Sequence, residues 1–281
     1  MSAIALPLSR RRPGVGTIYA WELRKLRAQR RTYIGLGAAV LVPLVFIFAL
    51  LTSNGGPEEI PFGRYVRDSG LAIPLVAMFF GSIWFFPLVT ALVSGDIVAA
   101  EDGNGTLKTI LTRSAERWQL FAAKVLAALS YTFAALLLYM LVGLVIGGLV
   151  YGFNPLVSLS GTHISVGRGL ALTAAGGLAY FVPMTAVASI ALLLSTLSRN
   201  SAAAVVGTLM ISLIMQLLGA INALSFLHPY LLSEQFNAWQ GFLREPIDWA
   251  PIGHAAWVSA AYGIPALALS FTAFLRRDVA A

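Results

Sequence analysis

The chain of 281 residues is 58% hydrophobic and only 11% charged, with a formal net charge of +7. A soluble single domain could not hide that apolar share from water, so the main solvent must be a lipid bilayer. The basic residues lie between long apolar runs and do not form one polar domain, which argues against a nucleic-acid partner. Cysteine is absent, so disulfides and thiolate metal sites are excluded.

Residues 1–32 predict a cytoplasmic segment that is retained. The apolar stretch before Arg10 is too short for a secretory signal, and the next apolar run starts too late for a twin-arginine signal. The stretch from Ile18 to Arg31 is basic and amphipathic, which predicts an interfacial helix beside anionic headgroups. A second interpretation, that its cations only enforce orientation, carries equal weight. One face of this helix holds Tyr19, Leu23 and Leu26, and the other faces hold Arg24, Lys25, Arg27 and Arg30.

Residues 33–281 predict an all-α transmembrane domain. A helix needs about 20 apolar residues to cross a hydrocarbon core about 30 Å thick. The third apolar stretch is longer than that, so its first turns, through Lys124, are expected to extend into the cytosol. Pro87 and Pro183 lie inside spans and predict kinks. The six stretches that meet the length test are approximately 33–52, 71–95, 119–152, 170–195, 202–224 and 253–275.

The distribution of basic residues predicts the orientation of the spans. Lys and Arg in short loops are retained on the cytoplasmic side. With the N-terminus inside, 15 of the 19 basic residues are cytoplasmic: eight before the first span, four at 96–124, Arg199, and two at 276–277. The other side keeps the remaining four. An arrangement with both termini in the cytosol is therefore predicted, in a multi-pass protein of the inner membrane.

Small and hydroxylated residues inside the spans suggest how the helices pack. Glycines in the third span would let another helix approach closely, and packing inside one subunit is favoured over a dimer seam. Ser189 and Ser195 are expected to bond the backbone carbonyl four residues back. Residues 225–252 predict short helices in the outer interface. The glycines are Gly143, Gly147, Gly148 and Gly152.

The segment between the second and third spans carries the most distinctive pattern. Residues 102–105 contain two glycines that permit positive φ, which predicts a turn. Leu107, Ile110 and Leu111 follow at helical spacing, with Lys108 and Arg113 on other faces. This predicts a short amphipathic helix at the inner membrane surface. The residues singled out in this segment are Asp96, Glu101, Gly105, Thr106, Leu107, Lys108, Ile110, Leu111 and Arg113.

The basic leading helix, the six spans, this loop and the ending Phe274…Arg276-Arg277-Asp278 resemble the membrane subunits of type-two ATP-binding-cassette exporters. The resemblance covers nearly the whole chain. It implies that residues 33–281 are a six-helix permease domain and that the loop carries a coupling helix, which docks into a separate P-loop ATPase subunit. It also implies pairing with a second permease subunit, identical or not. Family members often have proline where this chain reads Arg113-Ser114-Ala115, so the match departs locally there.

The sequence also suggests where the energy for such transport would come from. No Gly-rich loop ending in Gly-Lys-Ser or Gly-Lys-Thr is present, so the chain itself has no P-loop for ATP phosphates. We therefore expect no catalytic role and no bound cofactor here, with ATP and Mg held by the partner ATPase.

Three other classes of function are the alternatives. A secondary transporter usually needs ionisable groups in the membrane, whereas Gln216 and Asn222 do not titrate. An intramembrane enzyme would need a metal or nucleophile constellation, but His163, His228 and His254 are isolated in the sequence. A membrane scaffold without transport activity is also compatible with the pattern. If the chain does form a path, Phe80, Trp84 and Gln216 are candidate lining residues, and the cargo is left open.

Overall fold

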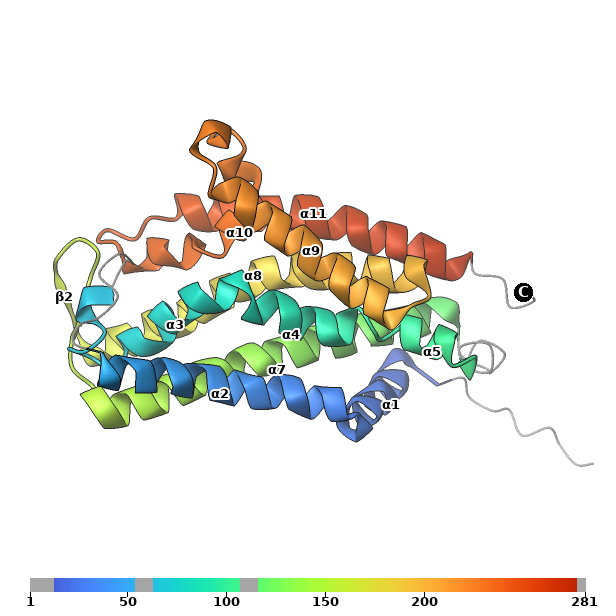
Figure 1. The fold of residues 1–281 in the computed structure, drawn as a ribbon, viewed down its shortest axis with the longest axis horizontal. Coiled ribbons are helices and arrows are strands. Elements are labelled where there is room, and N and C mark those ends of the chain that lie inside the picture. The colour runs from blue at the N-terminus through green and yellow to red at the C-terminus, as the bar shows by residue number, and fades with distance from the viewer. Residues whose placement is uncertain (1–12, 54–62, 107–115, 277–281) are drawn as a thin grey trace, which may run out of the picture.

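Six long apolar segments run along the main axis of the computed structural model, which describes residues 13–53, 63–106 and 116–276 (Figure 1). In this part of the chain, five single helices and one bent pair are long and apolar enough to cross a bilayer. The predicted spans coincide with these five helices and the bent pair within a few residues, except that the fifth ends at Gly219 and not near 224. The single helices are α2 (Arg30–Thr52), α7 (Arg117–Tyr151), α8 (Val166–Ser198), α9 (Ser201–Gly219) and α11 (Ala250–Leu275).

Shorter elements lie beyond the long helices. Helices α1 (Val15–Ala28) and α5 (Ala99–Gly103) occupy one end of the bundle, called the α1 end below, where the described chain also finishes (Figure 1). At the opposite end, called the hairpin end, lie β1 (Leu156–Val157) and β2 (His163–Ile164). The remaining short elements are η1 (Gly63–Tyr65), η2 (Asn222–Leu224), η3 (His228–Tyr230), α10 (Leu232–Gln235) and η4 (Ala238–Leu243).

The hairpin is the one departure from the all-α prediction among the described residues. Leu156 pairs with Ile164 and Val157 with His163 in antiparallel register. Gly161, with φ of 82°, permits the tight connection. Strands of two residues are too short to show the alternating pattern from which strands are predicted. The short helices expected in 225–252 are confirmed by η3, α10 and η4.

The second span is a bent pair, α3 (Ala72–Ile83) and α4 (Phe85–Ser94), whose axes differ by 64°. The sequence predicted one kinked helix over 71–95, and the structure breaks it at Trp84, where φ is −130° and ψ is −45°. Pro87 explains the break because it has no N–H to donate to the Ile83 carbonyl and its ring crowds that carbonyl. By contrast, α8 continues without interruption through Pro183.

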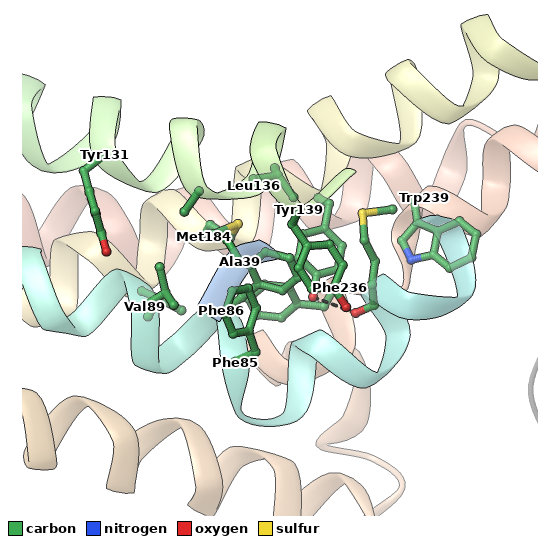
Figure 2. Packing of buried hydrophobic residues seen from close by; sticks show 14 of the residues in the cluster. Ala39, Phe85, Phe86, Val89, Tyr131, Leu136, Tyr139, Met184, Phe236 and Trp239 are labelled. Atoms are coloured by element: carbon green, nitrogen blue, oxygen red, sulfur yellow. Dashed lines mark hydrogen bonds between the residues drawn. The ribbon is translucent and has the colours of Figure 1, made fainter. Parts of the chain in front are cut away.

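Aromatic side chains from α7 and α8 hold this bend in place, and Figure 2 shows one of them, Tyr139 of α7, beside Phe86. The ring of Phe86 packs between those of Tyr139 and Tyr180, with centroid distances of 4.9 Å to each. The Tyr139 hydroxyl donates to the Ala77 carbonyl at 2.7 Å, and the Tyr180 hydroxyl donates to the Met78 carbonyl at 3.0 Å. Helix α3 is therefore attached to two neighbouring spans by hydrogen bonds as well as by packing.

Glycines of α7 allow α3 to approach closely. A Cβ atom on Gly147 would lie 2.7 Å from the Ile73 side chain, and one on Gly143 would lie 3.3 Å from Pro74. Both neighbours belong to the same chain. The interpretation of these two glycines as packing sites inside one subunit is therefore confirmed.

We expect Gly147→Ala to lower the free energy of unfolding by about 1–3 kcal/mol, because the added methyl group must displace Ile73 or separate α3 from α7. The matched control is Gly37→Ala in α2, where nothing lies within 4 Å of the new Cβ. That change should be neutral or stabilising by up to about 1 kcal/mol, since alanine favours helix. Unfolding in detergent micelles measures both, and equal effects of the two substitutions would contradict the packing account.

Candidate functional site: a buried ion network

Helix α1 lies against α7 with one face buried. Ile18, Glu22 and Leu26 are buried on that face. The Tyr19 hydroxyl lies 2.7 Å from the hydroxyl of Ser130 in α7, so the side chain reaches across the contact. Two residues of the predicted apolar face, Tyr19 and Leu26, thus pack on the chain itself, and the position of this helix in the membrane interface stays a prediction. Of the other predicted residues, Leu23 is half-buried, and the exposed ones are Arg24, Arg27 and Arg30.

Four charged side chains from α1, α5 and α7 form one connected cluster, called the ion network below. The Lys124 ammonium lies 3.1 Å from a Glu22 carboxylate oxygen and 2.6 Å from a Glu101 carboxylate oxygen. It also donates to the Ile97 carbonyl at 3.1 Å. Lys25 joins the same two carboxylates, 2.7 Å from Glu22 and in direct contact with Glu101. Two cations and two anions therefore alternate around a closed set of contacts.

The burial of the ion network makes this pairing necessary. Lys124 and Glu22 are both fully buried, and an isolated charge in such surroundings would cost several kcal/mol. The extension of the first turns of the third span, through Lys124, into the cytosol stays a prediction, and the structure adds that α1 and α5 cover the Lys124 side chain. It lies inside the protein because α1 and α5 each bring a carboxylate to it.

A second ion pair lies beside the network. Arg31, near the start of α2, contacts the carboxylate of Asp96, which is buried in the turn after α4. A cavity of about 30 Å³ between the pair and the network is lined by Glu22, Lys25, Arg31, Asp96 and Glu101. That volume is enough for a water molecule or two between polar groups.

The start of α5 is also attached to α8. The Ser195 hydroxyl oxygen accepts hydrogen bonds from the backbone N–H groups of Val98 at 3.3 Å and Ala99 at 3.0 Å. The expectation that Ser195 bonds the backbone carbonyl four residues back is not met, because two N–H groups at the start of α5, which have no partner within that helix, lie next to its hydroxyl. Ser189 does donate to the Thr185 carbonyl four residues back, at 2.7 Å, as predicted.

The structure describes only the first part of the predicted coupling segment. Asp96 and Glu101 are ion-paired as above, and Gly105 has the positive φ that the turn prediction required, 68°. The Thr106 hydroxyl donates to the Glu101 carbonyl at 3.1 Å. The predicted amphipathic helix falls outside the described residues, and with it Leu107, Lys108, Ile110, Leu111 and Arg113.

The candidate path residues lie around the bend between α3 and α4. Phe80 is 41% exposed and packs on Phe46 with a centroid distance of 5.5 Å, while Trp84 is 61% exposed. Gln216 in α9 is half-buried and lines a small cleft with Pro87. Both aromatic side chains thus face the outside of the single chain.

The electrostatics of the ion network favour the ionised form of Glu101. Burial by itself raises the pKa of this carboxyl, but the ammonium groups of Lys124 and Lys25 outweigh burial and bring the pKa below its ordinary value of 4.5. The carboxylate is therefore charged at neutral pH, and its pairing stabilises the folded protein there.

Sequence reasoning missed the ion network, although two signals were present. Lys124 follows the start of a long apolar helix by about two turns, and Glu22 lies on the apolar face of α1. Each is a charged residue at a position where the helical pattern of apolar residues predicts a buried side chain. Glu22 and Lys124 are 102 residues apart, so no local pattern pairs them.

The chain matches a known protein family. Residues 38–280 match the model of the family DUF2705, described as a protein of unknown function. No curated protein matches the chain. The matched range includes all six long segments apart from the first residues of α2, and it leaves α1 outside.

We expect Glu101→Gln to lower the free energy of unfolding at pH 7 by on the order of 2–3 kcal/mol, because the buried ammonium group of Lys124 and the half-buried one of Lys25 lose a shared anion. The stability that a carboxylate with a lowered pKa provides is present above its ordinary pKa and is lost as the pH falls below it. The difference from the wild type should therefore shrink below about pH 4.

Unfolding of detergent-solubilised protein across this pH range is the measurement. Arg244→Gln is the control, because Arg244 is 58% exposed in its ion pair with Asp248 and should change stability by less than about 1 kcal/mol. A Glu101→Gln difference that is the same at acidic and neutral pH would contradict the pairing account.

Proposed function

The chain belongs to the DUF2705 family of proteins of unknown function, and we propose that it is the permease subunit of an ATP-driven exporter in the inner membrane. A separate P-loop ATPase would hold ATP and Mg, and a second permease subunit would complete the path. The chain itself would have no catalytic role.

The observation that carries the proposal is the attachment of the segment after α4 to four other helices. Glu101 contacts α1 and α7 through the ion network, Asp96 contacts α2, and the start of α5 contacts α8. A coupling element must transmit movement from a partner to the spans, and it can do so only if it is attached stiffly. These contacts supply that attachment.

The same contacts indicate how the spans would respond. A push on the end of α5 would pass through Glu101 and Lys124 into α7, and through the turn at Asp96 into α4. The bend at Trp84 separates α4 from α3, so α4 can tilt while α3 stays attached to Tyr139 and Tyr180. ATP binding by the partner would thereby shift the population between inward-open and outward-open states.

A secondary transporter fits the charge distribution less well. Such proteins bind substrate and coupling ions near the bilayer midplane. In the six long segments, as far as the structure describes them, the charged residues lie in the first or last turns, and Lys124 lies about two turns from the start of α7. The buried charges therefore gather at the α1 end, where a partner outside the membrane would dock. A scaffold without transport activity would have no need of such attachment.

We expect the α1 end to face the cytosol and the hairpin end to face the other side, following the split of basic residues. Because the native chain has no cysteine, single cysteines can be labelled without background. His163→Cys, on the exposed side of the hairpin, should react with a membrane-impermeant thiol reagent in intact cells. Asn104→Cys, exposed after α5, should react only after permeabilisation. The opposite labelling pattern would overturn the orientation.

Aspartate substitutions in the predicted coupling helix test whether the ATPase docks on this helix. Leu107→Asp combined with Leu111→Asp should abolish co-purification of the P-loop ATPase that we expect to accompany the wild-type chain, since an unpaired charge would be buried at the contact. Leu159→Asp is the matched control: this leucine is exposed at the hairpin end, so the ATPase should still co-purify.

Membrane abundance must be equal for all variants, because none of these substitutions falls in a span. Co-purification with the double variant at the wild-type level would exclude the segment as the docking element. Absence of any ATPase from the wild-type preparation would refute the proposed function itself.

A further inference from the structure

Glu234, in the short helix α10, differs from the other carboxylates that the structure describes. Asp68 and Glu116 are exposed. Glu234 is half-buried, yet among the described residues its side chain has neither an ion pair nor a hydrogen-bond partner. Every other described carboxylate that is buried or half-buried forms an ion pair: Glu22, Asp96, Glu101, Asp102, Glu245 and Asp248.

The Glu234 carboxylate lies against the last turn of α9. A Cβ atom on Gly219 would lie 2.6 Å from one of its oxygens, so glycine leaves the room that the carboxylate occupies. The carbonyl end of a helix carries a partial negative charge, and α9 has no basic residue in its last turn to offset it. The rings of His228 and His254, in the neighbouring segments, lie at backbone carbonyls instead. Carboxylate and helix end therefore repel each other until a cation joins them.

This contact lies at the depth of the hydrocarbon core. Helix α8 has 33 residues and is about 50 Å long, so its central 30 Å or so lie in the core when the helix is centred. Tyr180 is about 21 Å from the start of α8, close to the midplane. The ring of Phe236, which directly follows α10, packs on Tyr180 with a centroid distance of 5.0 Å. Helix α10 is thus deeper than the outer interface that the sequence predicted for 225–252.

The length of α9 gives the same depth. This helix starts at the α1 end, after the turn that ends α8, and its 19 residues reach about 28 Å. Gly219 therefore ends well short of the hairpin end of α8. The exposed segment 220–230, with η2 and η3, projects to the side of the bundle and not beyond its hairpin end (Figure 1). Irregular backbone at this depth is tolerated only where protein covers it or water reaches it.

A second identical copy of the chain does not supply the missing cation. Two copies with the same orientation in the membrane place the same residues at the same depth. Among the described residues, the basic side chains lie at one end of the bundle or the other, apart from Lys124, which is buried in the ion network. Ammonium groups of lipids lie with the headgroups, outside the core. The cation must therefore arrive through water that reaches the end of α9.

We propose that Glu234 and the last turn of α9 bind a monovalent cation, either a metal ion or the ammonium group of an organic molecule, in a water-filled vestibule. One carboxylate balances one positive charge, whereas a divalent ion would leave a net charge in the core. Gln216 lies one turn before Gly219 on the same face of α9 and offers a neutral amide oxygen. The site goes beyond the proposed function and does not depend on an ATPase partner.

The test uses the purified full chain in lipid nanodiscs, where water reaches both membrane faces. Ala220→Cys, exposed beside Gly219, is the reporter, and Leu159→Cys, exposed at the hairpin end, is the control. Each is modified with a cationic trimethylammonium or an anionic sulfonate methanethiosulfonate. The preference for the cationic reagent should be about 10-fold stronger at the reporter than at the control, as one unit charge nearby would cause. Glu234→Gln should remove this difference and leave the control unchanged.

Protection of Ala220→Cys from a neutral maleimide then identifies the cation. Sodium chloride and tetramethylammonium chloride are added separately, and the control reporter corrects for ionic strength. Slower reaction in sodium would assign a metal ion, slower reaction in tetramethylammonium would assign an ammonium group, and Glu234→Gln should abolish either effect. Protection by neither salt would overturn the proposal, as would an unchanged reagent preference in Glu234→Gln. A reporter that reacts with neither charged reagent would overturn it too, because protein would then cover the end of α9.

Discussion

The buried ammonium group of Lys124 is the constraint on which the α1 end of the molecule depends. A charge on a fully buried side chain is tolerated only with anions at contact distance, and α7 supplies no anion next to Lys124. The carboxylates come from α1 and α5, so both elements must lie against α7. Lys25 then balances the charge, because it joins the same two carboxylates and makes the ion network neutral.

Helix α4 is held at both of its ends by different physical means. At the α1 end, Asp96 and the start of α5 attach it through an ion pair and through hydrogen bonds to Ser195. At the other end, the break at Trp84 interrupts the helix between α3 and α4, and the rings of Phe85 and Tyr139 pack against Phe86 of α4. The missing N–H of one proline thus divides this segment into two helices whose axes differ by 64°.

The sequence predicted the features that follow from local chemistry. The spans follow from apolar length, the turn at Gly105 from glycine, and the packing of Gly147 from the absence of a side chain. The ion network and the role of Ser195 depend on which segments meet in space, and one sequence without relatives does not contain that information. The hairpin was missed because strands of two residues have no period to detect.

Helix association in a bilayer gains little from the hydrophobic effect, because lipid chains are as apolar as leucine. Position must then be determined by contacts that depend on direction and shape. Gly147 sets the distance between α3 and α7, and the hydrogen bond of the Tyr139 hydroxyl sets the position of α3 along the axis of α7. Apolar residues would hold α1 on α7 equally well in several rotations, whereas Glu22 meets Lys124 in only one of them. Replacing a buried ion pair with apolar residues is often neutral for stability, so the stronger reason for these charges is the single orientation that they specify. If the segment after α4 transmits movement as proposed, it needs that single orientation more than it needs additional stability.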